Sequence, residues 1–416
     1  MASKSYDCVI AGGGPAGTAT GIRLAEAGMS VLIVEKKPFP RFHIGESLIP
    51  AANRMLKNLG VWDQIESGGF VRKYGAEFCY GDGTETVHNV FADGLVPGYE
   101  YTYQVERSRF DKILLDRASS VGCEVLQPVE IKSIDQLDDR WELDIQSQSS
   151  SDHRISANWF LDATGRSCLL GKELTLKRRD FDLPKRFAVF NHFFGVNRHP
   201  GSQAGNIIIV RVAHGWFWSI PLDEERTSVG LVTTRNEFRD RPEAVFRDAV
   251  ENNPFMRGWM KNAEAIDDFR CEVDYSYYRE QSAGKNWMLL GDAAGFIDPV
   301  FSSGVYLALE SASVASELLT GSAQARGSLS LKEQRQYHEQ MQSHLNNMLE
   351  LVTLFYDDRA FAVFMKPKNV FQLFAAVNSV IAGHTENDRA VRWRFALFRA
   401  ICRLNRRVNL VPSVSL

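Results

Sequence analysis

The chain has 416 residues, enough for about two to three domains of ordinary size or one large composite domain. Hydrophobic residues make up 44% of it and charged residues 24%, a balance that excludes a disordered or fibrous protein. The net charge of −3 excludes the broad positive field that attracts nucleic acid. The six cysteines lack C-x-x-C spacing, which argues against a zinc ribbon or a disulfide framework. Neither a signal-peptide pattern nor an apolar run of about 18 residues is apparent, so we expect a cytoplasmic protein without a transmembrane segment.

The first 35 residues predict a strand, a glycine-rich turn, a helix and a second strand. Residues 6–11 and 30–35 are short apolar runs, and residues 18–28 follow a helical pattern that ends at a glycine. A βαβ unit of this length, with glycines at its first turn, is typical of dinucleotide-binding folds.

Three glycines in this turn have the G-x-G-x-x-G spacing. Gly12 allows the tight turn, Gly14 lets a pyrophosphate approach the backbone, and Gly17 lets the helix pack on the strand. The helix amino terminus adds amide donors and positive potential. Glu35 ends the second strand, where a carboxylate binds a ribose hydroxyl. We therefore predict a bound nucleotide, and the lack of a second such spacing argues against a separate NAD(P)H domain.

The remainder of the chain predicts strands in the middle and helices at the end. Strand patterns cover residues 76–104, 124–146, 154–161, 186–234 and 286–292, and helical patterns cover residues 110–119, 304–319 and most of the chain after 330. Apolar and polar residues alternate over 186–234, which predicts a half-buried antiparallel sheet.

Three further motifs resemble those of FAD-dependent aromatic hydroxylases. Residues 162–165 read Asp-Ala-Thr-Gly, like the family's D-A-[ST]-G turn. Gly291-Asp292 follows an apolar run, like the family's G-D motif, whose aspartate binds the ribityl chain of FAD. Residues 105–111 resemble the R-x-x-F-D helix start, whose arginine, here Arg107, lies near the flavin. The resemblance implies that the nucleotide is FAD.

We therefore predict an α/β fold with three parts: a Rossmann-like FAD-binding domain of the aromatic-hydroxylase type, an inserted and mostly antiparallel β-sheet domain on the substrate side, and a helical C-terminal region. The FAD-binding domain would comprise residues 1–75, 105–170 and 285–325, the substrate-side domain residues 76–104 and 171–284, and the C-terminal region residues 326–416.

Four motifs narrow the resemblance to the flavin-dependent halogenases. Residues 216–221 spell W-x-W-x-I-P, the signature hexapeptide of that family. Residues 296–304 fit F-x-x-P-x-x-S-x-G, residues 70–75 fit the F-x-x-K-x-G context of the family's active-site lysine, and residues 45–47 match its G-E-S stretch. Two tryptophans at i and i+2 of a strand share one face, so core filling is the alternative interpretation of that pair.

The resemblance implies an enzyme that uses reduced FAD, O2 and chloride or bromide to make hypohalous acid. The acid would reach Lys73, the implied catalytic residue, which either hydrogen-bonds it or carries the halogen on its amine. An ammonium in a dry aromatic pocket has a lowered pKa, which suits both roles. The alternative is a solvated surface lysine. Halide would bind the backbone amides of Ser303 and Gly304.

The resemblance also implies a set of cofactor contacts, a set of shielding residues and two kinds of partner. The cofactor contacts would be Gly12, Gly14, Pro15, Ala16, Gly17, Glu35, Lys36, Arg41, Ser47, Arg107, Asp292, Pro299 and Gly304. The residues that line the tunnel and shield the flavin would be Trp216, Trp218, Pro221, Phe296 and Phe301. The partners would be a flavin reductase that supplies FADH2 and the aromatic substrate, free or borne by a carrier protein.

One departure from the family pattern bears on the substrate. Halogenases of free tryptophan carry a glutamate two residues before the Ser303 position, whereas this chain has Phe301. No carboxylate at that position can assist arenium deprotonation. The chain instead resembles the branch that acts on electron-rich phenols and pyrroles, often tethered to an acyl or peptidyl carrier protein, and residues 274–277 also resemble that branch.

Residues 389–407 contain seven arginines and no acid, with apolar residues interleaved. This pattern predicts either a basic amphipathic helix that contacts an acidic carrier protein or a membrane surface, or a tail helix packed on the body of the protein. His192 and His214 flank the predicted sheet, and we expect them to be structural. The alternatives to a halogenase are a flavoprotein reductase of the geranylgeranyl-reductase type, an FAD-dependent aromatic hydroxylase and a non-catalytic flavin-binding partner.

Overall fold

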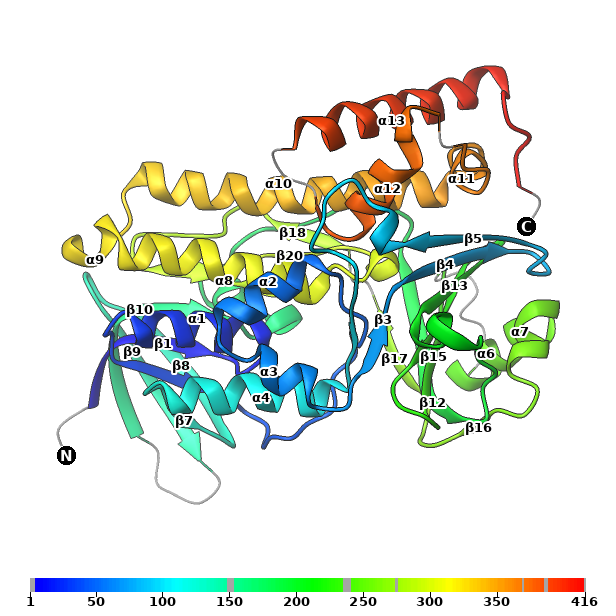
Figure 1. The fold of residues 1–416 in the computed structure, drawn as a ribbon. Coiled ribbons are helices and arrows are strands. Elements are labelled where there is room, and N and C mark those ends of the chain that lie inside the picture. Colours follow the sequence, from blue (N-terminus) through cyan, green and yellow to red (C-terminus); the bar gives the residue numbers. More distant parts are fainter. Residues whose placement is uncertain are drawn as a thin grey trace.

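The computed structural model describes residues 4–147, 153–234, 241–273, 276–368, 370–384 and 388–414. It confirms the predicted α/β class, with mixed sheets and a helical C-terminal region (Figure 1). Residues 274–275, part of the segment used to predict the substrate branch, lie outside the described residues. Among the described helices, none combines the length and apolar character needed to cross a bilayer.

A seven-stranded sheet carries the glycine turn. Its strand order is β7 (Glu124–Leu126), β2 (Val31–Val34), β1 (Lys4–Ala11), β10 (His153–Asp162), β9 (Trp141–Ser147) and β8 (Val129–Gln136), with β19 (Trp287–Leu289) also paired to β10. The β7–β2–β1–β10–β19 part is parallel, whereas β9 and β8 are antiparallel. The glycine turn leaves the carboxyl end of β1, the edge at which such sheets bind nucleotides.

Alternate residues of β1 face two different cores. Cys8 and Ile10 pack against helices α1 (Pro15–Glu26), α4 (Arg107–Ser120) and α8 (Gly304–Thr320), whereas Val9 and Ala11 pack on the opposite side around Trp141. Helix α1 begins three residues earlier than predicted, because Pro15 occupies its first turn directly after Gly14, a position that proline favours.

An eight-stranded sheet forms the second half of the molecule. Its order is β16 (Glu264–Ala265), β12 (Arg186–Phe194), β15 (Thr227–Thr234), β14 (Gly215–Pro221), β13 (Ile207–Val212), β4 (Gly75–Tyr80) and β5 (Glu85–Val90), with β17 (Arg270–Val273) also paired to β12. It is antiparallel except for the β13–β4 pair.

The prediction of a half-buried sheet over 186–234 was wrong. Every residue of β14 is buried, because helices cover both faces of the sheet. Phe217 packs with α6 (Pro242–Glu251) and α7 (Pro254–Trp259) on one side, while Trp216 and Trp218 pack against the C-terminal helices on the other.

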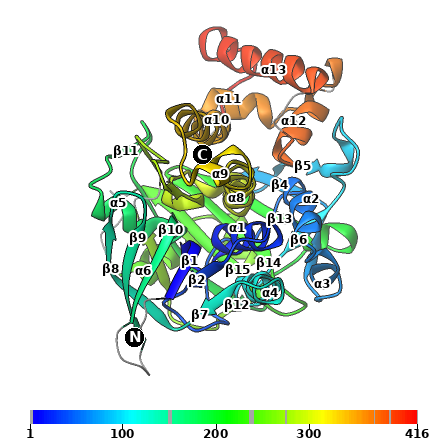
Figure 2. The same ribbon diagram turned by 90° about the vertical axis from the view of Figure 1, so that its left-hand side faces the viewer.

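The remaining elements connect and cover the two large sheets. Two small sheets are β3 (Val71–Lys73)–β6 (Thr102–Gln104) and β11 (Arg178–Asp180)–β18 (Tyr277–Arg279)–β20 (Gly295–Phe296). The other helices are α2 (Ala51–Asn58), α3 (Trp62–Glu66), α5 (Leu169–Glu173), α9 (Ser322–Arg326), α10 (Leu331–Tyr356), α11 (Asp358–Phe364), α12 (Leu373–Ile381) and α13 (Arg389–Val408). The 3-10 turns are η1 (Phe91–Asp93), η2 (Gly165–Ser167), η3 (Gly201–Gly205), η5 (Gly291–Ala293), η6 (Pro299–Phe301) and η7 (Val370–Gln372). Figures 1 and 2 show the C-terminal helices stacked over α8 and α10, with α13 outermost.

Candidate active site

The glycine turn between β1 and α1 is shaped by close backbone contacts. Gly12 has φ +106°, and a Cβ atom there would lie 2.3 Å from the Ala163 oxygen of the neighbouring turn. A Cβ at Gly17 would lie 2.0 Å from the Gly12 oxygen. A Cβ at Gly14 would instead meet only the Arg41 guanidinium, at 3.6 Å. The turn is therefore closed on its protein side and open at Gly14, as the approach of a pyrophosphate requires.

Acidic and basic side chains surround this opening. Glu35 is buried, and its two oxygens accept hydrogen bonds from the amides of Gly13 and Lys37, each at 2.9 Å. Arg41 lies between Glu35, at 3.9 Å, and the buried Asp111, at 3.3 Å. Pro15 and Ala16 are buried in the first turn of α1, whereas Lys36 is exposed.

Arg107 holds the turn that leads into the G-E-S stretch. Its guanidinium binds both Asp111 oxygens, at 2.7 and 3.0 Å, and donates to the carbonyl oxygens of Ile44 and Gly45 at 2.8 and 3.2 Å. The His43 ring, whose Nδ1 is 2.6 Å from the Ile44 oxygen, lies 3.4 Å from this guanidinium. Arg107 therefore acts here on the shape of the 43–45 turn.

Asp292, in η5, is the carboxylate of the G-D motif. It makes no hydrogen bond or ion pair through its side chain with any residue that the structure describes, although desolvation raises its pKa to about 6 despite the Arg107 and Arg166 charges. Asp292 is partly exposed, so its carboxylate can accept a hydrogen bond from a hydroxyl group of a ligand. Together with the open glycine turn, this residue fits the ribityl chain of FAD.

Lys73 lies at the end of β3 and is 2% exposed, which rules out the alternative of a solvated surface lysine. Its Nζ donates to Ser47 Oγ at 2.9 Å and to the Leu48 oxygen at 2.8 Å, and it lies 5.5 Å from the centre of the Phe91 ring. Desolvation lowers the pKa of Lys73 to about 7. Ser47, predicted as a cofactor contact, thus has its hydroxyl against the lysine.

Trp216 and Trp218 share one face of β14, with their ring centroids 5.9 Å apart. Trp216 Nε1 donates to Tyr356 Oη at 2.8 Å, and Tyr356 donates to Asp298 Oδ2 at 2.7 Å. Asp298 is buried, and desolvation raises its pKa to about 6. This chain of hydrogen bonds joins the W-x-W-x-I-P strand to the loop before α8, and the sequence motifs gave no sign of Tyr356.

That loop contains the predicted halide-binding residues. Pro299 begins η6, Ser302 adopts a left-handed conformation with φ +58°, and Ser303 is the residue before the first turn of α8. The Phe296 ring lies 3.5 Å from where a Cβ of Gly304 would be.

Phe301, the residue in place of the glutamate, packs at 5.9 Å from Phe78 and belongs to the same core cluster as Trp216 and Trp218. Phe91, which contacts Lys73, is also in this cluster. The aromatic cluster therefore extends from the α8 loop to the lysine. Pro221 ends β14 opposite Thr227.

The sequence did not reveal a buried pair that involves the G-E-S stretch. Glu46 directly precedes Ser47, is 1% exposed, and its Oε1 lies 2.7 Å from His192 Nε2. The second oxygen of Glu46 has no hydrogen-bond partner among the described residues. This pairing is consistent with the structural role predicted for His192. The sequence did not identify the partner, because Glu46 is 146 residues away along the chain.

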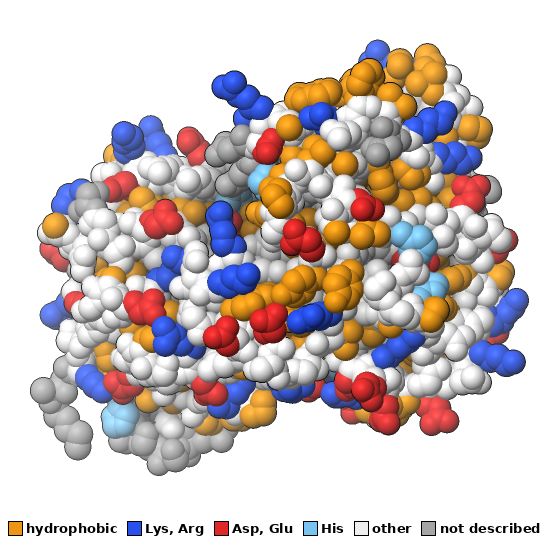
Figure 3. Space-filling model, in the orientation of Figure 1, with side chains coloured by type: hydrophobic (Ala, Val, Ile, Leu, Met, Phe, Trp, Pro, Cys, Tyr) orange, Lys and Arg blue, Asp and Glu red, His pale blue; other side chains and the backbone are white. Residues whose placement is uncertain are grey.

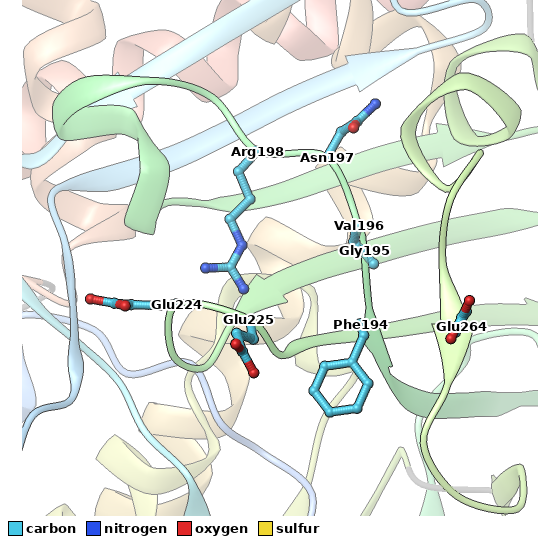
Figure 4. Close-up of a pocket in the computed structure, with 8 residues that line it drawn as sticks. All are labelled: Phe194, Gly195, Val196, Asn197, Arg198, Glu224, Glu225 and Glu264. Atoms are coloured by element: carbon cyan, nitrogen blue, oxygen red, sulfur yellow. The ribbon is translucent and has the colours of Figure 1, made fainter.

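The cavity of about 700 Å³ shown in Figure 4 lies elsewhere, at the ends of β12 and β15. Residues 194–198, Glu224, Glu225 and Glu264 line it. Arg198 extends along it toward Glu225, and its guanidinium bonds to the Arg226 oxygen at 2.7 Å and Thr227 Oγ1 at 3.0 Å. None of the predicted site residues lines this cavity, and Arg198 there stabilises a loop.

Comparison with known proteins agrees with this site. Residues 5–350 match the FAD binding domain family. The chain is 33% identical over 381 residues to the 1H-pyrrole-2-carbonyl-[peptidyl-carrier protein] chlorinase of Pseudomonas fluorescens, which covers 86% of this chain and 84% of that protein.

Two solved structures are similar over 97% of this chain. The flavin-dependent brominase Bmp2 has 27% identity and a TM-score of 0.85 over 100% of its chain. A flavoprotein/dehydrogenase from Cytophaga hutchinsonii has 28% identity and a TM-score of 0.88 over 99% of its chain. With its FAD-binding fold and these relatives, the chain belongs to the flavin-dependent halogenases, oxidoreductases that use FAD and a halide to halogenate aromatic compounds.

Proposed function

We propose that this halogenase acts on an electron-rich pyrrole or phenol, with Lys73 as the catalytic residue that delivers the halogen. When bound, reduced FAD supplies the two electrons with which O2, halide and a proton become hypohalous acid and water. A flavin reductase would supply the reduced cofactor. The observation that carries the proposal is the burial of Lys73 against an aromatic cluster, with a pKa of about 7.

The hydrogen bonds of Lys73 leave one position on its nitrogen for a ligand. In the neutral amine, the two N–H groups are directed to Ser47 Oγ and the Leu48 oxygen, and the lone pair is free to take the halogen. In the ammonium form, the same position holds a third N–H that can donate to the oxygen of hypohalous acid. In the amine route, the nitrogen takes the halogen and the hydroxide of the acid leaves with one amine proton as water; the aromatic carbon then takes the halogen and its proton returns to the nitrogen. In the ammonium route, the aromatic carbon takes the halogen directly from the acid, and its proton leaves with the hydroxide as water.

The remaining roles follow the family resemblance. The amides of Ser303 and Gly304, at the start of α8, would bind the halide, which helix amino termini favour. Trp216 and Trp218 would keep the substrate away from the flavin and so suppress hydroxylation. Tyr356 would hold Trp216 in place through its hydrogen bond.

Two observations support a pyrrole or phenol as the substrate. Phe301 stands where halogenases of tryptophan carry a base, and electron-rich rings need no such help. The similar protein of Pseudomonas fluorescens is named for a pyrrole borne by a peptidyl carrier protein. We infer that a carrier-borne pyrrole is the substrate of this chain as well, and that a free phenol or pyrrole is a poorer one.

The test is an incubation of the protein with FAD, a flavin reductase, NADH, O2 and either chloride or bromide. The substrates are pyrrole-2-carbonyl thioester on a peptidyl carrier domain and a panel of free phenols and pyrroles, and mass spectrometry detects the halogen isotope pattern. We expect halogenated pyrrole with the wild-type protein and none with Lys73→Ala, which should still bind FAD. Halogenation by Lys73→Ala would contradict the role of the lysine.

A further inference from the structure

A second cavity, of about 490 Å³, lies between η1 and the α12 region. Residues 93–95 form one side of it, and Gln372, Phe374 and Asn378 are on the other. The amide of Leu95 donates to Ser379 Oγ at 2.8 Å, which fixes η1 against α12. The cavity therefore has walls that are held together by the fold.

Two buried side-chain amides at this cavity have unused hydrogen-bonding atoms. Asn89 Nδ2 donates to Asn378 Oδ1 at 3.0 Å, and Asn378 lines the cavity. Asn378 Nδ2 and Asn89 Oδ1 have no partner among the described residues, although the two residues are at most 1% exposed. Exchanging N and O in both amides leaves the same two positions unpaired. An unpaired buried polar atom is destabilising, and a polar group of a ligand in the cavity, such as that of a secondary amide, would give the Asn378 side chain a partner.

One wall of this cavity belongs to the turn whose first residue contacts Lys73. Its wall at Asp93 belongs to η1, which begins at Phe91, and the Phe91 ring lies 5.5 Å from Lys73 Nζ. The Gly94 amide donates to the Phe91 oxygen at 3.0 Å, so this wall and Phe91 belong to the same turn. A ligand in the cavity would therefore contact the turn that carries the ring beside the lysine.

The other end of the cavity meets helix α13. Arg394 donates to the Phe371 oxygen at 2.9 Å and to Gln372 Oε1 at 3.1 Å, and Gln372 lines the cavity. Helix α13 also packs on α12, whose residues Phe374 and Asn378 line the cavity. Figures 1 and 3 show this helix at the edge of the molecule, with hydrophobic and basic side chains side by side over it.

We call the exposed side of this helix the outer face of α13. It comprises Arg389, Arg392, Trp393, Arg403, Leu404, Arg407 and Val408. Trp393 and Leu404 are 48% and 47% exposed, which is unusual for large apolar side chains on a helix that also buries Phe398 and Cys402. Arg399 and Arg403 pair with Glu350, and Arg406 pairs with Asp357. Arg389, Arg392 and Arg407 have no ion pair among the residues that the structure describes, so the outer face carries positive charge around an apolar centre.

We propose that the outer face of α13 docks an acidic, helical carrier domain, and that the 490 Å³ cavity receives the phosphopantetheine arm of that domain. The charge of the face favours an acidic partner, and its exposed tryptophan supplies the apolar anchor that protein interfaces favour. The arm contains secondary amides, which can pair with the side-chain amide of Asn378. This inference rests on the proposed carrier-borne substrate.

The test compares R389E/R392E/R407E with K261E/K332E/R335E, a control with the same change of charge at exposed residues away from α13. We expect the first variant to raise KM for the carrier-borne pyrrole at least about tenfold while leaving turnover of pyrrole-2-carbonyl-pantetheine unchanged, because rim charges act mainly on association. The control should resemble the wild type. Asn378→Leu should raise KM for both thioesters but not for a free phenol.

Fluorescence anisotropy with labelled phosphopantetheinyl carrier domain measures docking without turnover. If R389E/R392E/R407E loses binding and the control keeps it, the docking inference is supported even where the carrier-borne pyrrole is not the substrate. The binding measurement therefore tests docking separately from the proposed substrate. Equal carrier affinity of both variants would overturn it. Binding of the wild type to phosphatidylglycerol vesicles but not to the carrier domain would assign the face to a membrane surface and would also overturn it.

Discussion

Replacing Lys73 with methionine should stabilise the folded protein at pH 7 and abolish halogenation. The folded-state pKa of about 7 lies below the ordinary value of 10.5, so the unfolded state binds an extra proton between these pH values. This difference costs the folded state about 4 kcal/mol at pH 7 and about 2 kcal/mol at pH 9. Stability of the wild-type protein should therefore rise with pH across this window.

Methionine removes this cost and also the hydrogen bonds to Ser47 and Leu48, whose loss costs about 2 kcal/mol in total. The Lys73→Met variant should then be more stable than the wild type by about 2 kcal/mol at pH 7 and about equal to it at pH 9. Urea unfolding of the cofactor-free proteins, followed by tryptophan fluorescence, measures the difference at each pH.

The control is Lys332→Met, at an exposed lysine on α10, which should follow the wild type at every pH. If the Lys73→Met and wild-type curves instead run parallel between pH 7 and 9, Lys73 is charged in the folded protein throughout this range. The desolvation argument would then be refuted, and with it the free lone pair on which the haloamine route depends.

Three further predictions concern the cofactor turn and the loop before α8. Gly17→Ala should abolish FAD binding, measured by flavin absorbance after gel filtration, because its Cβ would lie 2.0 Å from the Gly12 oxygen. Asp292→Asn should stabilise the cofactor-free protein at pH 7 but weaken FAD binding, because it removes a carboxylate whose pKa desolvation has raised to about 6. In thermal unfolding, the variant and the wild type should be equally stable at pH 4, and the advantage of the variant should grow toward pH 7. Tyr356→Phe should destabilise the protein by about 1–3 kcal/mol, more at pH 8 than at pH 5, because Asp298 then loses a donor to its ionised form.

The features that the sequence predicted well are those encoded over short stretches. The order of strand, glycine turn, helix and strand follows from the spacing of apolar residues and glycines within 35 residues, and the structure has these elements. Lys73 was identified only through a family motif. Its burial and lowered pKa depend on Ser47, Leu48 and Phe91, which come from separate segments of the chain. No local sequence pattern encodes these contacts.

Trp216 and Trp218 show why the rest of the fold and the site could not be predicted from the sequence. Alternation along a strand correctly placed Trp216 and Trp218 on one face, because that property depends only on the pleat. What covers the face is a helix that begins more than a hundred residues later, and its Tyr356 satisfies the indole N–H of Trp216 from 140 residues away. Because helices cover both sides, the sheet needs no polar face, and the local alternation that predicted a solvent-facing side was misleading. Signature tryptophans are therefore also core residues, so substitutions at Trp216 will lower stability as well as alter the reaction.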